Sequence, residues 1–337
     1  MLSFDTPEVD ENFFRQRLAS AIAYRERLGF FNSMGGGTNV FRLVHAEGDY
    51  LPGLVCDWYN GVLVMQAHSM GMHRMFPLFT GLFRELLGDK LLSIFDKSSS
   101  TLPKNCDPQV VDGYLWGIEP MEYEIREHGN RLFINFFEGQ KTGFFIDQRE
   151  NRHLVQELSW GRRLLNCFGY TGGFSLAALR GGAEYVETVD ISKKAIDLCN
   201  RNVELNFPNC SNHKGTVADV LQYIQTIKQS GNPAFDFIIL DPPAFAKNHR
   251  SLQQGLKGYR SINQRAMEAL PAGGFLMTFS CSQAVSTEEF RTMVFTAAMN
   301  ARRRVRIVRQ LPHAMDHPVS IHHPEGDYLK GLLLQVE

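Results

Sequence analysis

The stretch that decides the fold is Leu164-Leu165-Asn166-Cys167-Phe168-Gly169-Tyr170-Thr171-Gly172-Gly173. Its apolar start predicts a buried strand, and the glycines predict a tight turn onto the N-terminus of a helix, where backbone amides can face a ligand. Thr171 stands where the dinucleotide pattern GxGxxG has its second glycine, which argues against a pyrophosphate cradle for NAD or FAD. The turn therefore favours a nucleoside without a pyrophosphate.

Two acidic residues follow the next predicted strands. Asp190 ends the second strand, about twenty residues after the turn, where a carboxylate can accept both hydroxyl protons of a ribose. Asp219 follows the third strand, where it can accept a proton from the exocyclic amine of adenine or cap the next helix. These two roles of Asp219 are compatible.

The surrounding sequence alternates strand-like and helix-like runs. The strand-like runs are 163–168, 185–190, 235–241, 275–280 and 306–311, and the helix-like runs start near Gly173, Ser192, Asp219, Asn263 and Thr287. This alternation predicts an α/β fold with a doubly wound parallel sheet, which places its ligands just outside the carboxyl ends of the strands.

The residues before this region predict a small α+β domain over 1–118. An amphipathic helix is expected over 8–28 and another over 72–87, and short antiparallel strands over 41–44, 51–55 and 62–66. A hairpin of 122–126 and 131–136, turning at His128-Gly129-Asn130, joins it to the second domain, which we place at 119–337.

The fourth strand of the sheet ends in Asp241-Pro242-Pro243, a rigid ledge that suits the polar edge of a planar base. The stretch 244–267 that follows has no acid, the aromatic residues Phe245 and Tyr259, and five basic residues: Lys247, Arg250, Lys257, Arg260 and Arg265. Basic side chains that contact phosphates and aromatic rings that stack on bases are typical of a single-stranded RNA site. A solvated loop and helix face is the alternative.

Composition sets broader limits. The 337 residues carry a net charge of -1, so any nucleic-acid contact must be local. The six cysteines form no CxxC pair, which indicates reduced thiols, and no apolar run reaches the roughly 18 residues of a membrane span. We expect a cytoplasmic protein without membrane contact. His313 and His317 lack the helical zinc-protease pattern, so we expect no bound metal. A homodimer is a possible oligomeric state.

Five motifs in order resemble the RlmI-type bacterial ribosomal RNA cytosine-C5 methyltransferases. They are 139–149 (GQKTGFFIDQR), 166–174 (NCFGYTGGF), 241–243 (DPP), 280–282 (SCS) and 324–331 (PEGDYLKG). The resemblance covers about 40–337. It implies a Rossmann-like methyltransferase domain that uses S-adenosylmethionine and acts on ribosomal RNA, at a single-stranded or flipped cytosine.

The resemblance also implies the site residues. Cofactor-binding residues would be Gln148, Arg149, Asn166, Phe168, Gly169, Tyr170, Thr171, Gly172, Asp190, Ile191, Asp219 and Asp241, with Gln148 and Arg149 near the methionine end. The sequence departs from the pattern in two ways. It has no room for the RNA-binding PUA domain with which family members usually begin, and Ala244 stands where broader RNA cytosine-C5 enzymes have a second cysteine.

Carbon 5 of cytosine is a poor nucleophile until a thiolate adds to carbon 6, so the reaction needs a cysteine. Cys281 is the candidate, because it ends the fifth strand beside Asp241, which would hydrogen-bond or protonate the ring edge. We expect the other cysteines to be buried. The competing functions are an amino-group methyltransferase on RNA or protein and a non-catalytic RNA-binding module, neither of which needs a thiolate at this position.

Overall fold

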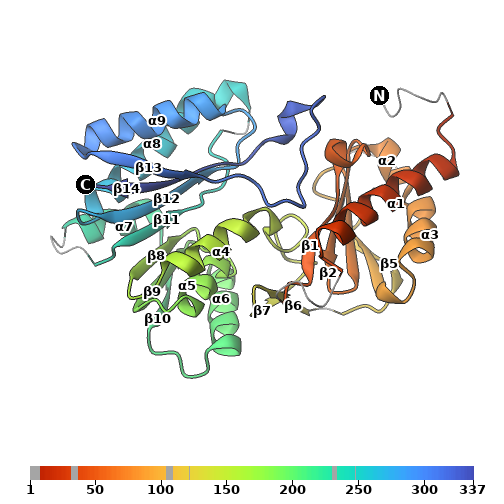
Figure 1. Cartoon of the computed structure of the whole chain (residues 1–337), viewed down its shortest axis with the longest axis horizontal. Helices are drawn as coiled ribbons and strands as arrows, with labels where there is room; N and C mark the ends of the chain where they lie inside the picture. Colours follow the sequence, from red (N-terminus) through yellow and green to blue (C-terminus); the bar gives the residue numbers. More distant parts are fainter. Residues whose placement is uncertain (1–7, 32–36, 104–108, 121, 230–233, 247) are drawn as a thin grey trace. The chain divides into compact units, whose positions relative to one another are not determined.

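The computed structural model describes residues 8–31, 37–103, 109–120, 122–229, 234–246 and 248–337 (Figure 1). The chain divides into two compact units, one of residues up to Arg149 with Ala314–Gly326, and one of Glu150–His313 with Asp327–Glu337. The first unit thus extends beyond residue 118, the predicted domain boundary, and it also includes Ala314–Gly326 from late in the chain. The reason is that the predicted joining hairpin packs within the first unit.

The first unit contains a five-stranded sheet in the order β1-β2-β3-β4-β5. Its elements are α1 (Glu11–Arg27), β1 (Val40–His45), β2 (Leu54–Tyr59), β3 (Val62–Ala67), α2 (Met70–Arg74), α3 (Phe76–Leu87), β4 (Ser93–Asp96), β5 (Gly113–Gly117), β6 (Tyr123–Glu127) and β7 (Asn130–Ile134), with 3-10 turns η1 (Ala46–Asp49), η2 (Gly88–Lys90) and η3 (Ile146–Gln148). The predicted antiparallel strands are confirmed, although β2 begins after the Pro52-Gly53 turn. Helices α1 and α3 bury one apolar core against this sheet.

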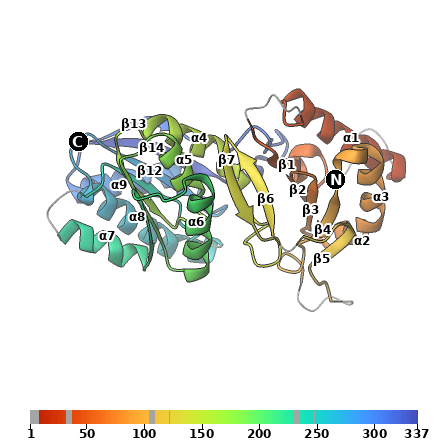
Figure 2. The same cartoon turned by 90° about the horizontal axis from the view of Figure 1, so that it is seen from below.

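The predicted hairpin is confirmed as β6 and β7, joined by His128 and Gly129 at φ 46° and 78°. Positive φ at both central residues matches the right-handed twist of the strands. Ile125 and Leu132 are fully buried or nearly so, and the backbone amide of Asn39 donates to the Arg126 carbonyl at 2.9 Å. The hairpin is therefore part of the first unit (Figure 2).

The second unit contains a seven-stranded sheet in the order β10-β9-β8-β11-β12-β14-β13. Its elements are α4 (Arg149–Leu158), β8 (Arg163–Cys167), α5 (Gly173–Arg180), β9 (Tyr185–Asp190), α6 (Lys193–Asn206), β10 (His213–Val217), α7 (Val220–Gln229), β11 (Phe237–Leu240), η4 (His249–Ser251), α8 (Leu252–Ala269), β12 (Gly274–Ser280), α9 (Thr287–Ala301), β13 (Val305–Gln310), η5 (Pro324–Gly326) and β14 (Lys330–Val336). Arg149 begins α4 but is grouped with the first unit, as is η5. The doubly wound α/β fold is confirmed.

Two features of this sheet differ from the sequence prediction. β14 lies between β12 and β13 and runs antiparallel to both, so the sheet is mixed at that end. Helix α8 begins at Leu252 rather than near Asn263, because Leu256, Tyr259 and Ile262 already pack on the sheet. The parallel strands β8 to β12 have the predicted direction.

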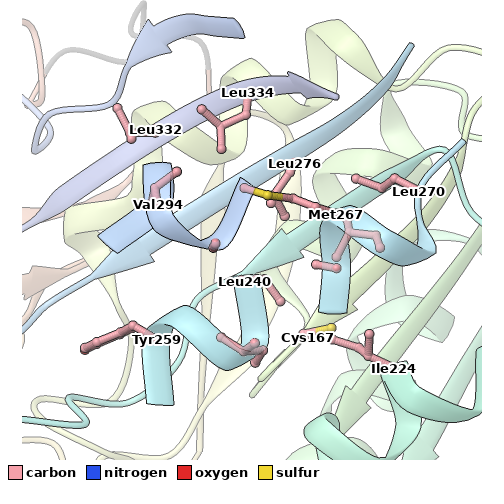
Figure 3. Close-up of a cluster of buried hydrophobic side chains, with 14 of the residues drawn as sticks. Cys167, Ile224, Leu240, Tyr259, Met267, Leu270, Leu276, Val294, Leu332 and Leu334 are labelled. Atoms are coloured by element: carbon pink, nitrogen blue, oxygen red, sulfur yellow. The ribbon is translucent and has the colours of Figure 1, made fainter. Parts of the chain in front are cut away.

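The core of the second unit explains why its central strands are continuously apolar. β11 is buried along its whole length, because α7, α8 and α9 cover one face of the sheet and α5 and α6 contact the other. Figure 3 shows Leu240, Leu276 and Leu334 of the sheet facing side chains of these helices such as Met267. Strand order reverses between β8 and β11, so their carboxyl ends form the switch point at which doubly wound sheets bind ligands.

Candidate active site

The turn after β8 is fixed by close packing. Phe168, Tyr170 and Gly172 have φ of 57°, 46° and 84°, in the left-handed region. A Cβ on Gly169 would lie 2.2 Å from Thr188 Cγ2, and one on Gly172 would lie 2.4 Å from Cys199 Sγ. Both glycines are therefore required by the neighbouring strand and helix, and α5 begins directly after them with no side-chain cap.

A buried polar chain supports the turn from below. Asn166 Nδ2 donates to Ser175 Oγ at 2.9 Å, and Ser175 Oγ lies 2.6 Å from Thr188 Oγ1. Asn202 Nδ2 donates to the Thr171 carbonyl at 3.0 Å. Asn166 Oδ1 is buried and has no hydrogen-bond partner among the described residues, and an unpartnered acceptor at this place fits a site whose ligand is a hydrogen-bond donor.

Asp190 is joined to the same turn. Its two carboxylate oxygens accept the backbone amides of Tyr170 at 3.1 Å and Ser192 at 2.8 Å, and its side chain is half-buried. These bonds orient the carboxylate while leaving lone pairs for further donors. The next residue, Ile191, is 72% exposed, which offers an apolar surface at the strand end. A ribose with an attached flat base matches this arrangement.

Asp219 is exposed and caps a helix. Its Oδ1 accepts the backbone amide of Gln222 at 2.9 Å, in the first turn of α7. The capping alternative considered for this residue is therefore confirmed, while contact with adenine stays a prediction.

Cys281 and Asp241 follow β12 and β11, which are neighbouring parallel strands, so they lie at the same edge of the sheet. Cys281 Sγ lies 4.0 Å from the Pro242 carbonyl, and the side chain is half-buried. Burial raises the pKa of Tyr259 to about 12, and the charges of Cys281 and Asp241 add to that rise, so both lie near this phenol. The structure thus brings the two predicted catalytic residues together.

The other described cysteines differ from Cys281. Cys56, Cys167 and Cys199 are buried, as predicted, and burial raises the pKa of each thiol, to about 12 for Cys199. Cys210 is half-buried, and Cys106 lies outside the described residues. Buried thiols with raised pKa are inert.

Gln148 and Arg149 belong to the first unit and are nearly fully buried. The Arg149 guanidinium makes two 2.8 Å hydrogen bonds to the Asp316 carboxylate and lies over the Phe30 ring. Sequence reasoning missed this ion pair, because Asp316 is distant in the chain and lies outside any motif. That Gln148 and Arg149 lie near the methionine end of the cofactor stays a prediction.

The basic stretch after Asp241 is only partly available to RNA. Lys257 and Arg260 of α8 line a groove of about 370 Å³ against α9, whose Glu288 and Glu289 line it from the other side. Tyr259 is fully buried, so the prediction that it stacks on a base is wrong: it packs on Phe245, 4.7 Å between ring centroids. Arg265 donates to the Leu221 carbonyl at 2.9 Å, and Lys247 lies outside the described residues.

The remaining histidine and membrane predictions can be placed briefly. His313 Nε2 accepts the backbone amide of Leu329 at 3.0 Å, and His317 Nδ1 lies 3.0 Å from Asp316 Oδ1. Within the described ranges, no group of three or more His, Cys, Asp or Glu side chains is arranged to hold a metal ion. In the same part of the chain, none of the helices combines the length and the apolar character needed to cross a membrane.

The fold and site define a class of protein. The family model for S-adenosylmethionine-dependent methyltransferases matches residues 41–318, and the chain is a member of that class, with S-adenosylmethionine as its cofactor. A structure of a methyltransferase complexed with SAH is similar in fold, with a TM-score of 0.87, 23% identity and coverage of 99% of this chain and 84% of that one. A methyltransferase from Streptococcus mutans has a TM-score of 0.86 at 22% identity, with the same coverage.

Curated relatives narrow the class. The chain is 38% identical to the protein named ribosomal RNA large subunit methyltransferase I of Pseudoalteromonas translucida, over 99% of this chain and 83% of the relative. It is 36% identical to the protein of the same name from Escherichia coli, with the same coverage. The chain belongs to this bacterial methyltransferase family, and the resemblance inferred from its five motifs is confirmed.

Proposed function

We propose that this methyltransferase transfers a methyl group to carbon 5 of a cytosine in large-subunit ribosomal RNA through a covalent adduct with Cys281. The observation that carries the proposal is a half-buried thiol after β12 near Asp241 after the neighbouring strand β11. The names of the relatives support a ribosomal RNA substrate. A cytoplasmic location and a homodimer are further parts of the proposal.

The chemistry follows from the position of Cys281. Its thiolate forms a bond to carbon 6, and the electron pair of the carbon 5–carbon 6 double bond makes carbon 5 nucleophilic. When bound, S-adenosylmethionine supplies the methyl group from its sulfonium sulfur. A base or water then removes the proton from carbon 5, and the pair in the sulfur–carbon 6 bond returns to Cys281 as the double bond re-forms. Asp241 hydrogen-bonds the ring edge while the adduct exists.

The product identifies the reaction. Incubation of the protein with large-subunit ribosomal RNA and labelled S-adenosylmethionine, followed by nuclease digestion and mass spectrometry, should yield labelled 5-methylcytidine. A nucleoside methylated on an exocyclic nitrogen would instead favour the amino-group reaction, and RNA binding without methylation would favour the binding module.

Around the turn, the proposed cofactor contacts are of two kinds. Phe168 and Tyr170 are half-buried and Ile191 is exposed, so their side chains can touch a ligand. Asn166 and Thr171 are buried, so Asn166 would act through its orphaned Oδ1 and Thr171 through its backbone. Gly169, Gly172, Asp190, Asp219 and Asp241 complete the proposed set in this unit.

Asp190→Ala should weaken S-adenosylmethionine binding at least about tenfold in calorimetry, because a charged acceptor for the ribose hydroxyls is lost. Asp197→Ala is the matched control: this exposed acid on α6 pairs only with Lys193 among the described residues, and its loss should leave affinity unchanged. Equal affinity of wild type and Asp190→Ala would remove Asp190 from the cofactor site.

Lys257→Glu with Arg260→Glu should weaken RNA binding and reduce the slope of log affinity against log salt by about 1.4, because two phosphate contacts are lost on a single strand. Arg302→Glu with Arg304→Glu, a pair of exposed arginines after α9, gives the same charge change elsewhere. Fluorescence anisotropy with labelled RNA measures both. If only the Arg302 and Arg304 pair weakens binding, the RNA groove lies away from α8.

A further inference from the structure

Lys330 is a buried cation at the first residue of β14. It is 6% exposed, and its ammonium donates to two backbone carbonyls, those of Ser282 at 2.6 Å and Tyr328 at 2.7 Å. Among the described residues it makes no ion pair, since no carboxylate oxygen lies within 4.0 Å of its nitrogen. Burial of a lysine without a paired carboxylate is costly, so this ammonium calls for a functional explanation.

Lys330 holds the chain on both sides of Cys281. In the antiparallel register of β12 and β14, Ser280 pairs with Lys330, so the residue before Cys281 is fixed by the strand. The residue after Cys281 is fixed by the side chain, through the Ser282 carbonyl. The Ser282 hydroxyl also donates to the Ala246 carbonyl. The lysine side chain is therefore one of the contacts that fix the position of the thiol.

Acidic side chains lie around the corner that Lys330 holds. The charged and titratable groups around this corner are Asp241 after β11, Tyr259 on α8, Glu289 on α9, His313 after β13, Asp327 and Tyr328 before β14, and Lys330 at its first residue; His313 lies 3.5 Å from Asp327. Asp241, Glu289 and Asp327 are acids, and negative charge nearby raises the pKa of a thiol. A fixed ammonium acts in the opposite direction, since a cation next to a cysteine favours its ionised form.

The charge state of Lys330 responds to the same groups. Burial lowers the pKa of its ammonium, while the charges of Asp327, Cys281 and Glu289 raise it. An ionised Cys281 thus stabilises the charged lysine, and by reciprocity the charged lysine stabilises the thiolate.

We propose that Lys330 is a positioning residue for the nucleophile: its ammonium holds the 280–282 corner in place and stabilises the Cys281 thiolate. This role rests on the proposed function, in which Cys281 attacks carbon 6. The motif 324–331 carried the family resemblance, but sequence reasoning gave Lys330 no role in it. A charged residue directly before the apolar run Gly331–Leu334 was the signal available.

The pH dependence of Cys281 alkylation tests this proposal without RNA or cofactor. The protein is treated with iodoacetamide from pH 6 to 10, and modification of the Cys281 peptide is followed by mass spectrometry. Lys330→Gln keeps a hydrogen-bond donor but removes the charge, so the midpoint of reactivity should rise by about one pH unit or more. Lys330→Arg should restore a midpoint close to that of wild type.

Lys228→Gln is the matched control, because this lysine at the end of α7 pairs with Glu268 and its loss removes one charge elsewhere. Its midpoint should equal that of wild type. Lys330→Met removes both donor and charge, and if it fails to fold, the comparison of Gln with Arg carries the test. An unchanged midpoint in Lys330→Gln would overturn the proposal.

The same samples separate this inference from the proposed function. If Cys281→Ala still methylates RNA, the covalent mechanism fails even when Lys330→Gln shifts the thiol midpoint. If Cys281→Ala is inactive and the Lys330→Gln midpoint equals that of wild type, the role of Lys330 fails alone. Loss of methyl transfer in Lys330→Gln that is recovered by raising the pH would support both.

Discussion

Cys281→Ala should lower methyl transfer to RNA by about a thousandfold or more, while leaving S-adenosylmethionine affinity unchanged. The reason is that carbon 5 of cytosine has too little electron density to take a methyl group until a thiolate has added to carbon 6, so no other contact replaces the missing sulfur. Cys281 is at the carboxyl end of β12, whereas the turn proposed to bind the cofactor follows β8. Methylation assays and calorimetry measure the two effects separately.

Substrate RNA containing 5-fluorocytosine gives a second readout of the same prediction. Fluorine at carbon 5 leaves no proton to remove, so the sulfur–carbon 6 bond cannot break after methylation. Wild-type protein should then stay attached to RNA through denaturing electrophoresis, and Cys281→Ala should not. Cys210→Ala, which changes a half-buried thiol that bonds to Asn212, is the control and should form the adduct normally. Methylation by Cys281→Ala would exclude the covalent route.

Release of the product needs a base that removes the carbon 5 proton, and the sequence offers few candidates for it. The residue that broader cytosine-C5 enzymes use as a second cysteine is Ala244 in this chain, so water or another side chain must take the carbon 5 proton. Tyr259 lies near Cys281 and Asp241, but burial raises its pKa to about 12. A phenol with so high a pKa is a poor choice for a resting-state base near neutral pH.

The sequence was most informative where local chemistry determines structure. The glycines of the turn, the apolar run of β11 and the strand-ending positions of Asp190, Asp241 and Cys281 all follow from residues close in the chain. Steric limits on φ, burial on both faces of a sheet and the geometry of parallel strands act over short segments. The structure confirms these expectations about the fold.

Long-range packing explains what the sequence did not predict. β14 inserts between β12 and β13 because its apolar residues complete the core, which no local periodicity of 330–336 could indicate. Tyr259 belongs to a stretch with basic residues and was expected to face RNA, yet its helical position turns it onto the sheet. The residue at which α8 begins determines which of its side chains face the sheet. This places Tyr259 in the core and not at the RNA-facing surface.

The buried charges of the first unit could not be anticipated for the same reason. Arg25 falls in the predicted helix 8–28 and Arg42 in the predicted strand 41–44, but they pair with Asp49 and Asp57 in the interior. Each pair joins residues from different elements, so neither is visible in a window of sequence. Charged residues of this unit therefore contribute to its interior as well as to its surface.

Asp316→Ala should destabilise the first unit by about 3–5 kcal/mol, since it leaves the buried Arg149 guanidinium without its carboxylate. Asp316 also accepts the backbone amide of Arg42 at 2.7 Å, so a second donor loses its partner. Urea unfolding followed by tryptophan fluorescence measures the change. Trp58 is buried in this unit, whereas Trp160 is exposed in the other, so a Trp160→Phe background removes the unwanted signal.

The buried carboxylate of Asp316 should also make the stability of the first unit depend on pH. Burial alone would raise the pKa of Asp316, but the Arg149 charge and the hydrogen bonds from Arg149 and His317 hold it well below its usual value. The contribution of Asp316 is therefore complete above the unfolded pKa of about 4 and is lost as the pH falls below it. Burial lowers the pKa of His317, so protonation of the unfolded chain below about pH 6.5 also favours unfolding. Both groups make the unit less stable in acid, and the midpoint of urea unfolding should fall from pH 7 to pH 4.

Two further variants decide whether the effect comes from an unpaired charge. Arg149→Met combined with Asp316→Leu removes both charges, so it should cost less than Asp316→Ala alone, because no buried ion is left without a partner. Glu124→Ala removes an exposed pair with Arg131 on the hairpin and should barely move the midpoint. If the double variant were less stable than Asp316→Ala, packing of the two side chains, and not compensation of their charges, would be what holds this part of the unit together.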